Sequence, residues 1–195
     1  MALSLILIAT ALLASLFVPS MSLFRRQSGK SDVYRGCLMV MDRFRTGLMN
    51  SQFETITIDP TGSAVSWQLT RDDVPFSGVT GDPLLTPDFG LLYYKAGEQK
   101  VYYKVHTASV TVLDRPTYLS LSDLLLARDT HSPRTQVIGR NVVEFKITDK
   151  DGDIALLEPP LRLTVTCEVD TKGRETNDVE RFVLAASVTP RSMRW

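Results

Sequence analysis

The sequence predicts an α+β protein in which a long N-terminal helix, membrane-spanning in its first half, packs on an antiparallel β-sheet domain. Three observations indicate this class. Residues 1–24 carry no charged side chain, apolar positions then recur at helical spacing as far as Leu48, and beyond Phe53 the hydrophobic period changes from about 3.6 residues to 2. We therefore divide the chain into a transmembrane half of the helix at 1–24, an amphipathic half at 25–53 and a β-rich globular head at 54–195.

Residues 2–24 satisfy the usual length requirement for a membrane-spanning helix, about 20 mostly apolar residues. They lack the basic start and the short apolar stretch of a cleavable signal peptide, so we expect the segment to be retained. Arg25, Arg26 and Lys30 follow the span, which by the positive-inside rule would keep the head in the cytoplasm unless a basic leader precedes Met1. The expected membrane-anchor and assembly residues are Leu3, Leu5, Leu7, Ala11, Leu12, Leu16 and Pro19, the last of which should bend the helix.

The amphipathic half carries one apolar stripe. Its members are separated by four, three, four and four residues, which places them on one face of a helix, while charged residues occupy the other side. We expect this stripe to pack against the sheet. The stripe consists of Val33, Cys37, Val40, Phe44 and Leu48.

The head is predicted from alternating apolar and polar residues bounded by turn residues. The three prolines and two glycines of residues 71–88 indicate a loop, and Ser120 or Ser122 could cap a short helix. The expected strands are 55–58 and 64–69 around a turn at 59–62, 91–94 and 101–105 around 96–98, a second β region beginning at 135–153, then 161–169 and the segment from 178 onwards.

Composition excludes some functions. The chain has 22 basic and 22 acidic residues, so no basic field favours nucleic acid as a partner. Its two cysteines, Cys37 and Cys167, fit neither a disulfide-dense scaffold nor a zinc cluster. They could pair in an oxidising compartment or remain two half-buried thiols, and the sequence leaves both alternatives open.

No catalytic constellation is evident, so we do not expect an enzyme. His106 ends a predicted strand and His131 lies in a loop, and neither has a serine or cysteine nucleophile motif nearby. Four paired tyrosines in one predicted hairpin favour cross-strand packing over an exposed recognition strip. These are Tyr93, Tyr94, Tyr102 and Tyr103.

The stretch "DKDGD" places Asp149, Asp151 and Asp153 within five residues and resembles part of a calcium loop. Its spacing differs from that of an EF-hand, and an Asp-Gly hairpin turn between two strands explains it more simply. We therefore expect no cofactor and favour no metal, with calcium at these three carboxylates as the alternative.

Three stretches together resemble the type IV pilin superfamily, in particular the minor pseudopilins of type II secretion (J-type or similar) and minor pilins. They are the apolar opening, "MVMDRFRTGLMNS", and "VIGRNVVEFKI…DGD…PPLRLTVTCEVD…FVLAASVTPR". The family's prepilins begin with a basic leader, a glycine and a glutamate, which this sequence lacks. Because "MALSLILIA" is similar to the residues that come after that glutamate, we expect Met1 to be an internal methionine of a longer reading frame.

The resemblance implies a structural minor subunit of a type IV pilus or type II secretion pseudopilus, anchored in the membrane before assembly and priming or tipping the filament. It implies other minor pilins or pseudopilins, the major pilin, an inner-membrane assembly platform and, if the leader exists, a prepilin peptidase as partners. The expected location is the bacterial inner membrane, single-pass, with the head in the periplasm or outside the cell. The alternative is a membrane-anchored periplasmic or extracellular β-domain that acts as a binding module unrelated to filaments.

Overall fold

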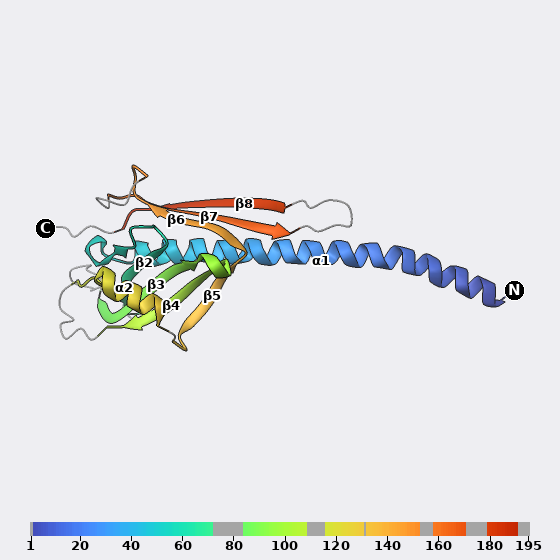
Figure 1. Ribbon diagram of the computed structural model, residues 1–195, viewed down its shortest axis with the longest axis horizontal. Coiled ribbons are helices and arrows are strands. Elements are labelled where there is room, and N and C mark those ends of the chain that lie inside the picture. The colour runs from blue at the N-terminus through green and yellow to red at the C-terminus, as the bar shows by residue number, and fades with distance from the viewer. Residues whose placement is uncertain are drawn as a thin grey trace.

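The computed structural model describes residues 2–71, 84–108, 116–130, 132–152, 158–170 and 179–190. Helix α1 (Ala2–Met49) begins the chain, and its first half projects beyond the strands (Figure 1). The described elements after it are a 3₁₀ turn (Phe53–Thr55), β1 (Thr57–Ile58), β2 (Ala64–Thr70), β3 (Leu85–Lys95), a second 3₁₀ turn (Ala96–Glu98), β4 (Lys100–Thr107), α2 (Leu121–Asp129), β5 (Thr135–Arg140), β6 (Val142–Thr148), β7 (Leu161–Asp170) and β8 (Val179–Val188).

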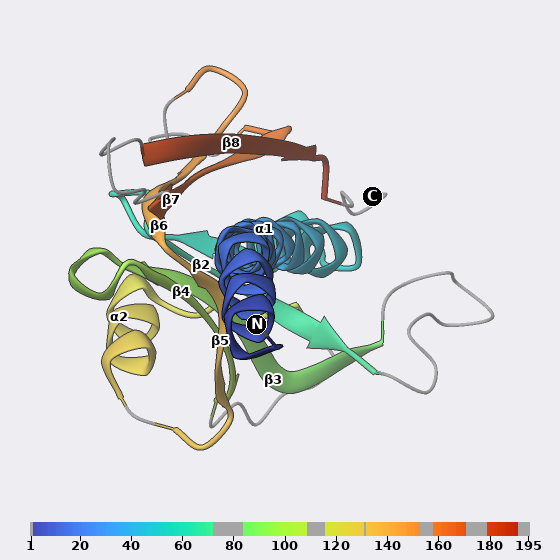
Figure 2. The same cartoon turned by 90° about the vertical axis from the view of Figure 1, so that its right-hand side faces the viewer.

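The described strands form two antiparallel sheets. β1 to β5 pair in chain order in a five-stranded sheet, and β6 to β8 form a three-stranded sheet. The second half of α1 lies between the two sheets and contacts β5, β7 and β8, as the view along the helix shows (Figure 2). The predicted fold class was a long helix, membrane-spanning in its first half, packed on an antiparallel β-sheet domain. It is wrong, because the described strands form two sheets on either side of the helix and no described helix can span a membrane.

The two sheets separate at a single residue, Asn141. β5 ends at Arg140 and pairs with β4, whereas β6 begins at Val142 and pairs with β7. Asn141 has a φ of 56°, in the left-handed region that asparagine tolerates better than most residues. The β-like stretch that the sequence suggests from residue 135 onwards is therefore divided between the two sheets by a backbone kink.

The predicted membrane span is also wrong. Among the helices of the described residues, none combines the length and the apolarity needed to cross a bilayer. The described exposed side chains of α1 pass from apolar Met21 and Phe24 to polar Gln27 and Ser28 within seven positions, and Ser20 precedes them. The expected single-pass placement in the inner membrane must be corrected accordingly.

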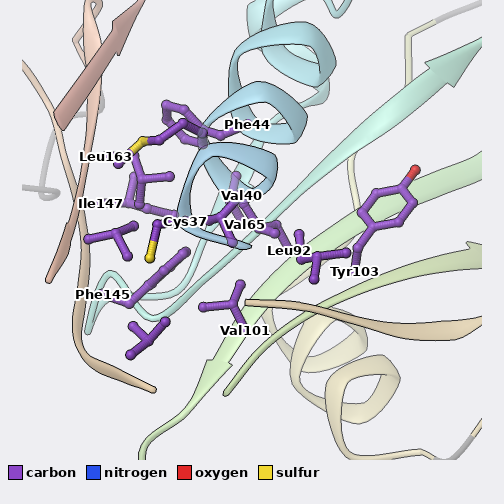
Figure 3. Packing of buried hydrophobic residues seen from close by; sticks show 14 of the residues in the cluster. Cys37, Val40, Phe44, Val65, Leu92, Val101, Tyr103, Phe145, Ile147 and Leu163 are labelled. Carbon is purple, nitrogen blue, oxygen red and sulfur yellow. The ribbon is translucent and has the colours of Figure 1, made fainter. Parts of the chain in front are cut away.

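One apolar core fills the space between α1 and the two sheets (Figure 3). Val40 and Phe44 of α1 are fully buried, as are Leu92 of β3 and Ile147 of β6. Each such side chain contributes about 1.5–3 kcal/mol by leaving water. The core thus holds the second half of α1 against both sheets at once.

A second apolar cluster lies on the other face of the five-stranded sheet, under α2. Ser120 is the N-cap of α2, because its Oγ accepts a hydrogen bond of 3.1 Å from the backbone N–H of Asp123. Leu124 of α2 then packs with Phe89 and Leu91 of β3. Both faces of the five-stranded sheet are therefore covered, one by α1 and one by α2.

Candidate interaction surface

The residues that the sequence assigns to assembly lie in the first half of α1. Their backbone is helical. The side chains of Leu3, Leu5, Leu7, Ala11, Leu12, Leu16 and Pro19 lie outside the described residues.

In the first half of α1, three large apolar side chains are exposed among those that the structure describes. Phe17, Met21 and Phe24 have exposed fractions of 67%, 59% and 73%. Their spacing of four and three residues puts them on one face of the helix. We call these three residues the α1 stripe. Counted at about 100° per residue, the stripe lies roughly opposite the buried face of the second half.

The predicted packing stripe lies entirely inside the protein. A disulfide joins Cys37 to Cys167 of β7 in the three-stranded sheet. The cysteine pairing that the sequence left open is thereby assigned. The buried members of this stripe are Val33, Cys37, Val40, Phe44 and Leu48.

Two surface contacts fix α1 where it leaves the sheets. Lys30 forms an ion pair with Glu180 of β8. One turn further on, the rings of Tyr34 and Phe182 meet edge to face with their centroids 6.2 Å apart. Exposed ion pairs contribute little stability, so the aromatic contact and the disulfide carry most of this attachment.

The tyrosines of the β3–β4 hairpin pack on other aromatic rings. Tyr93 and Tyr102 lie directly opposite each other in register and stack at 5.3 Å, which confirms cross-strand packing for this pair. Tyr94 stacks on Phe145 of β6 at 6.0 Å. The ring of Tyr103 stacks on Trp67 of β2 at 6.2 Å.

Tyr102 also provides a test of the local electrostatics. Its hydroxyl donates a hydrogen bond to Glu98, and this bond, together with burial, raises the pKa of Tyr102 to about 12. We expect the Glu98→Ala substitution to lower the pKa of Tyr102 towards the ordinary value of 10.0. The pKa of Tyr102 is higher in the folded protein than in the unfolded chain. The contribution of this hydrogen bond to the stability of the folded protein is therefore complete below pH 10 and is lost as the pH rises towards 12.

NMR titration of ring-¹³C-labelled tyrosine measures this pKa, with Tyr102→Phe assigning the signal. The control is Glu54→Ala, which removes an exposed carboxylate from elsewhere in the head and should leave the Tyr102 titration unchanged. A wild-type Tyr102 that titrates near the ordinary value of 10.0 would show that the bond to Glu98 does not form in solution.

Of the two histidines, the structure describes only His106. His131 lies outside the described residues. His106 of β4 is half-buried beside Lys104, and burial followed by the Lys104 charge lowers its pKa. Lys104 is 2% exposed and donates to the carbonyl oxygens of Ala127 (2.5 Å) and Thr130 (2.6 Å) at the end of α2. In the described part of the chain no hydrogen bond joins His106 to a hydroxyl or thiol.

The "DKDGD" stretch forms a turn where it is described. The backbone N–H of Asp151 donates to Oδ1 of Asp149 at 2.9 Å, and Gly152 has a φ of 85°. Asp153 lies outside the described residues, and within them no three potential metal ligands cluster. The absence of a metal stays the prediction for this segment, with calcium as the alternative.

The described residues thus form two antiparallel sheets with the second half of α1 held between them, and the first half of α1 presents three exposed large apolar side chains. No protein-family model, curated protein or solved structure matches the chain.

Proposed function

We propose that this protein is a structural subunit of a filament, in the manner of a minor pilin or pseudopilin, and that it assembles through the first half of α1. The observation that carries the proposal is the α1 stripe. Phe17, Met21 and Phe24 are exposed on a helix that projects beyond both sheets (Figure 1). Clustered large apolar side chains on a surface mark a site of association.

The shape of the protein favours repeated association over a closed pair. A projecting helix can contact one copy on one side and another copy on a different side, which gives a head-to-tail arrangement that extends into a helical filament. The sequence supports close approach of such helices because small side chains are frequent there. They include Ala9, Ala11, Ala14 and Ser15.

The attachment of α1 to the head suits a structural subunit. The Cys37–Cys167 disulfide, the Tyr34–Phe182 contact and the core beneath them fix the second half of the helix between the two sheets. A helix held on both sides moves with its head as one unit. Packing of the first half into a filament would therefore set the position of the head on the filament surface.

A charge on the stripe should prevent assembly. We expect the double variant Met21→Glu and Phe24→Glu to reduce the protein in sheared, sedimented filaments by about tenfold or more, because the apolar contacts are lost and carboxylates would be buried. The matched control is Gln27→Glu, which adds a carboxylate to the same exposed helix outside the stripe. Quantitative immunoblots of the filament fraction and of whole cells measure the effect.

Two results would contradict the proposal. The double variant could appear in the sedimented fraction at the wild-type level, which would show that the stripe is not buried in a filament. The wild-type protein could instead be absent from that fraction while remaining a folded monomer, which would favour an independent binding module.

A further inference from the structure

The three-stranded sheet ends in an open edge strand. In the described part of the chain β8 pairs with β7 on one side and with no strand on the other, and it lies at the rim of the protein (Figure 1). Every residue of β8 pairs with β7, from Val179 opposite Asp170 to Val188 opposite Leu161, without a shift in register. The outer edge of β8 is therefore a long and regular row of backbone N–H and C=O groups that a further strand can join.

The other edge strands of the two sheets carry features that prevent such pairing. β1 has only two residues. In β5 the extra residue Ile138 interrupts the pairing with β4, and in β6 the extra residue Val143 interrupts the pairing with β7. Short edges and bulges are two of the ways in which proteins block association through a sheet edge. Among the described strands, only β8 presents a long edge without either protection.

The sequence of β8 also lacks the residues that usually protect an edge. The segment "FVLAASV", residues 182–188, contains no charged residue, proline or glycine. The two charged residues before it are already paired within the chain. Glu180 forms an ion pair with Lys30 of α1, and Arg181 forms one with Glu168 of β7. Uncharged, mostly apolar segments of this kind associate as β-strands when their edge is exposed.

Large apolar side chains remain in contact with water on both faces of β8. On the outer face, Val179 and Val183 have exposed fractions of 52% and 64%. On the inner face, Phe182 and Leu184 are only partly buried at the margin of the core. The side chains of a strand added beside β8 would alternate between the same two faces and would cover both sets at once.

We propose that β8 pairs with β8 of a second copy, in antiparallel orientation around a two-fold axis through Val183. This register uses nearly the whole strand, and it places Phe182 opposite Leu184 of the second copy. The charged residues of β8 lie near its start and the alanines near its end. The two-fold axis therefore brings Arg181 opposite Ala185, and no like charges meet.

The proposed pair would join the two three-stranded sheets into one continuous antiparallel sheet. In each copy α1 contacts β7 and β8, so both helices would lie on the same face of this sheet. The two-fold axis makes them point in opposite directions. The pair does not use the α1 stripe, and it does not require filament assembly.

Site-specific cross-linking of the full chain tests the proposal. Val183→Cys places two thiols opposite each other across the two-fold axis, with Cβ atoms about 5 Å apart. Oxidation with diamide should then give a disulfide-linked dimer on non-reducing gels. Val137→Cys is the matched control, because Val137 is an exposed valine of the edge strand β5. Val179→Cys controls the register, because the two copies of this residue would lie at opposite ends of the pair.

We expect both control variants to stay monomeric under the same oxidation. Equal cross-linking of Val183→Cys and Val137→Cys would overturn the proposal. A dimer that forms through Val179→Cys more readily than through Val183→Cys would overturn it as well, because the strands would then not be antiparallel in the proposed register.

Sedimentation equilibrium provides a second measurement that needs no added cysteine. The full chain carries Met21→Glu and Phe24→Glu in this experiment, so that the α1 stripe does not contribute, and we expect a monomer–dimer equilibrium. Val183→Lys puts like charges opposite each other and should raise the dissociation constant about tenfold or more. Val137→Lys should leave the constant unchanged.

Both valines are exposed, so neither lysine enters the core. Equal dissociation constants of the two lysine variants would overturn the proposal. A chain that stays monomeric up to about 1 mM would also overturn it and would leave the edge of β8 to an extended segment of a different protein.

Discussion

Replacing both Cys37 and Cys167 with alanine is expected to lower the free energy of unfolding by about 5 kcal/mol. The disulfide joins residues 130 positions apart, and closing so long a loop in the unfolded chain removes conformational entropy worth roughly that amount. Small domains are stable by only about 5–15 kcal/mol, so the loss takes a large share of the total. Urea unfolding followed by circular dichroism measures the change.

The same experiment on the reduced wild-type protein provides the control, because reduction removes the cross-link without removing side-chain volume. The double variant and the reduced wild-type protein should both unfold at lower urea concentrations. The slope of the unfolding free energy against urea concentration should rise, because the unfolded chain without the cross-link exposes more surface. Val40→Ala, which trims a neighbouring fully buried side chain and keeps the disulfide, should lower the midpoint without this change in slope. A double cysteine variant within about 1 kcal/mol of the wild type would contradict the prediction.

The local elements of the head can be predicted from the sequence because their causes are local. The turn after β1 contains Gly62, whose φ of 71° suits glycine, and β2 follows it as expected. In β7 the alternating residues are buried, as a period of 2 requires. They are Leu161, Leu163, Val165 and Cys167.

The division into two sheets cannot be predicted in this way. The alternation continues from β5 into β6, and only the backbone conformation of Asn141 sends the two strands to different sheets. An asparagine in a β-like stretch is compatible with a turn, a bulge or an ordinary strand position. The hydrophobic period shows which residues are buried, but it does not show which sheet each residue joins.

The candidate site shows the same limit. The sequence indicates that Cys37 faces the core, yet its partner Cys167 lies 130 residues away and nothing local selects it. Arg43 belongs to the charged side of α1, and Trp67 occurs in a predicted strand. Both line one small cavity beside Tyr103 of β4, and their meeting there depends on tertiary packing.

Gly47→Ala is expected to destabilise the protein by about 3 kcal/mol, although alanine favours a helix over glycine by roughly 1 kcal/mol. A Cβ at this position would lie 2.3 Å from Cζ2 and 2.4 Å from Cε2 of Trp67. The ring cannot move away easily, because it also packs on Gly90 of β3, where a Cβ would lie 2.8 Å from the same Cε2. Either α1 must shift or the indole must leave its place in the core.

Gly29→Ala is the matched control, since this position lies in the same helix and a Cβ there would meet nothing within 4 Å. We expect it to be neutral or to stabilise the protein by up to about 1 kcal/mol. If close packing against Trp67 decides the outcome, thermal and urea unfolding should show that Gly47→Ala lowers the free energy of unfolding whereas Gly29→Ala leaves it unchanged or raises it. Combining Gly47→Ala with Trp67→Phe should recover part of the loss, because a smaller ring leaves room for the methyl group. Equal stabilities of the two alanine variants would show that α1 can move relative to β2 at little cost.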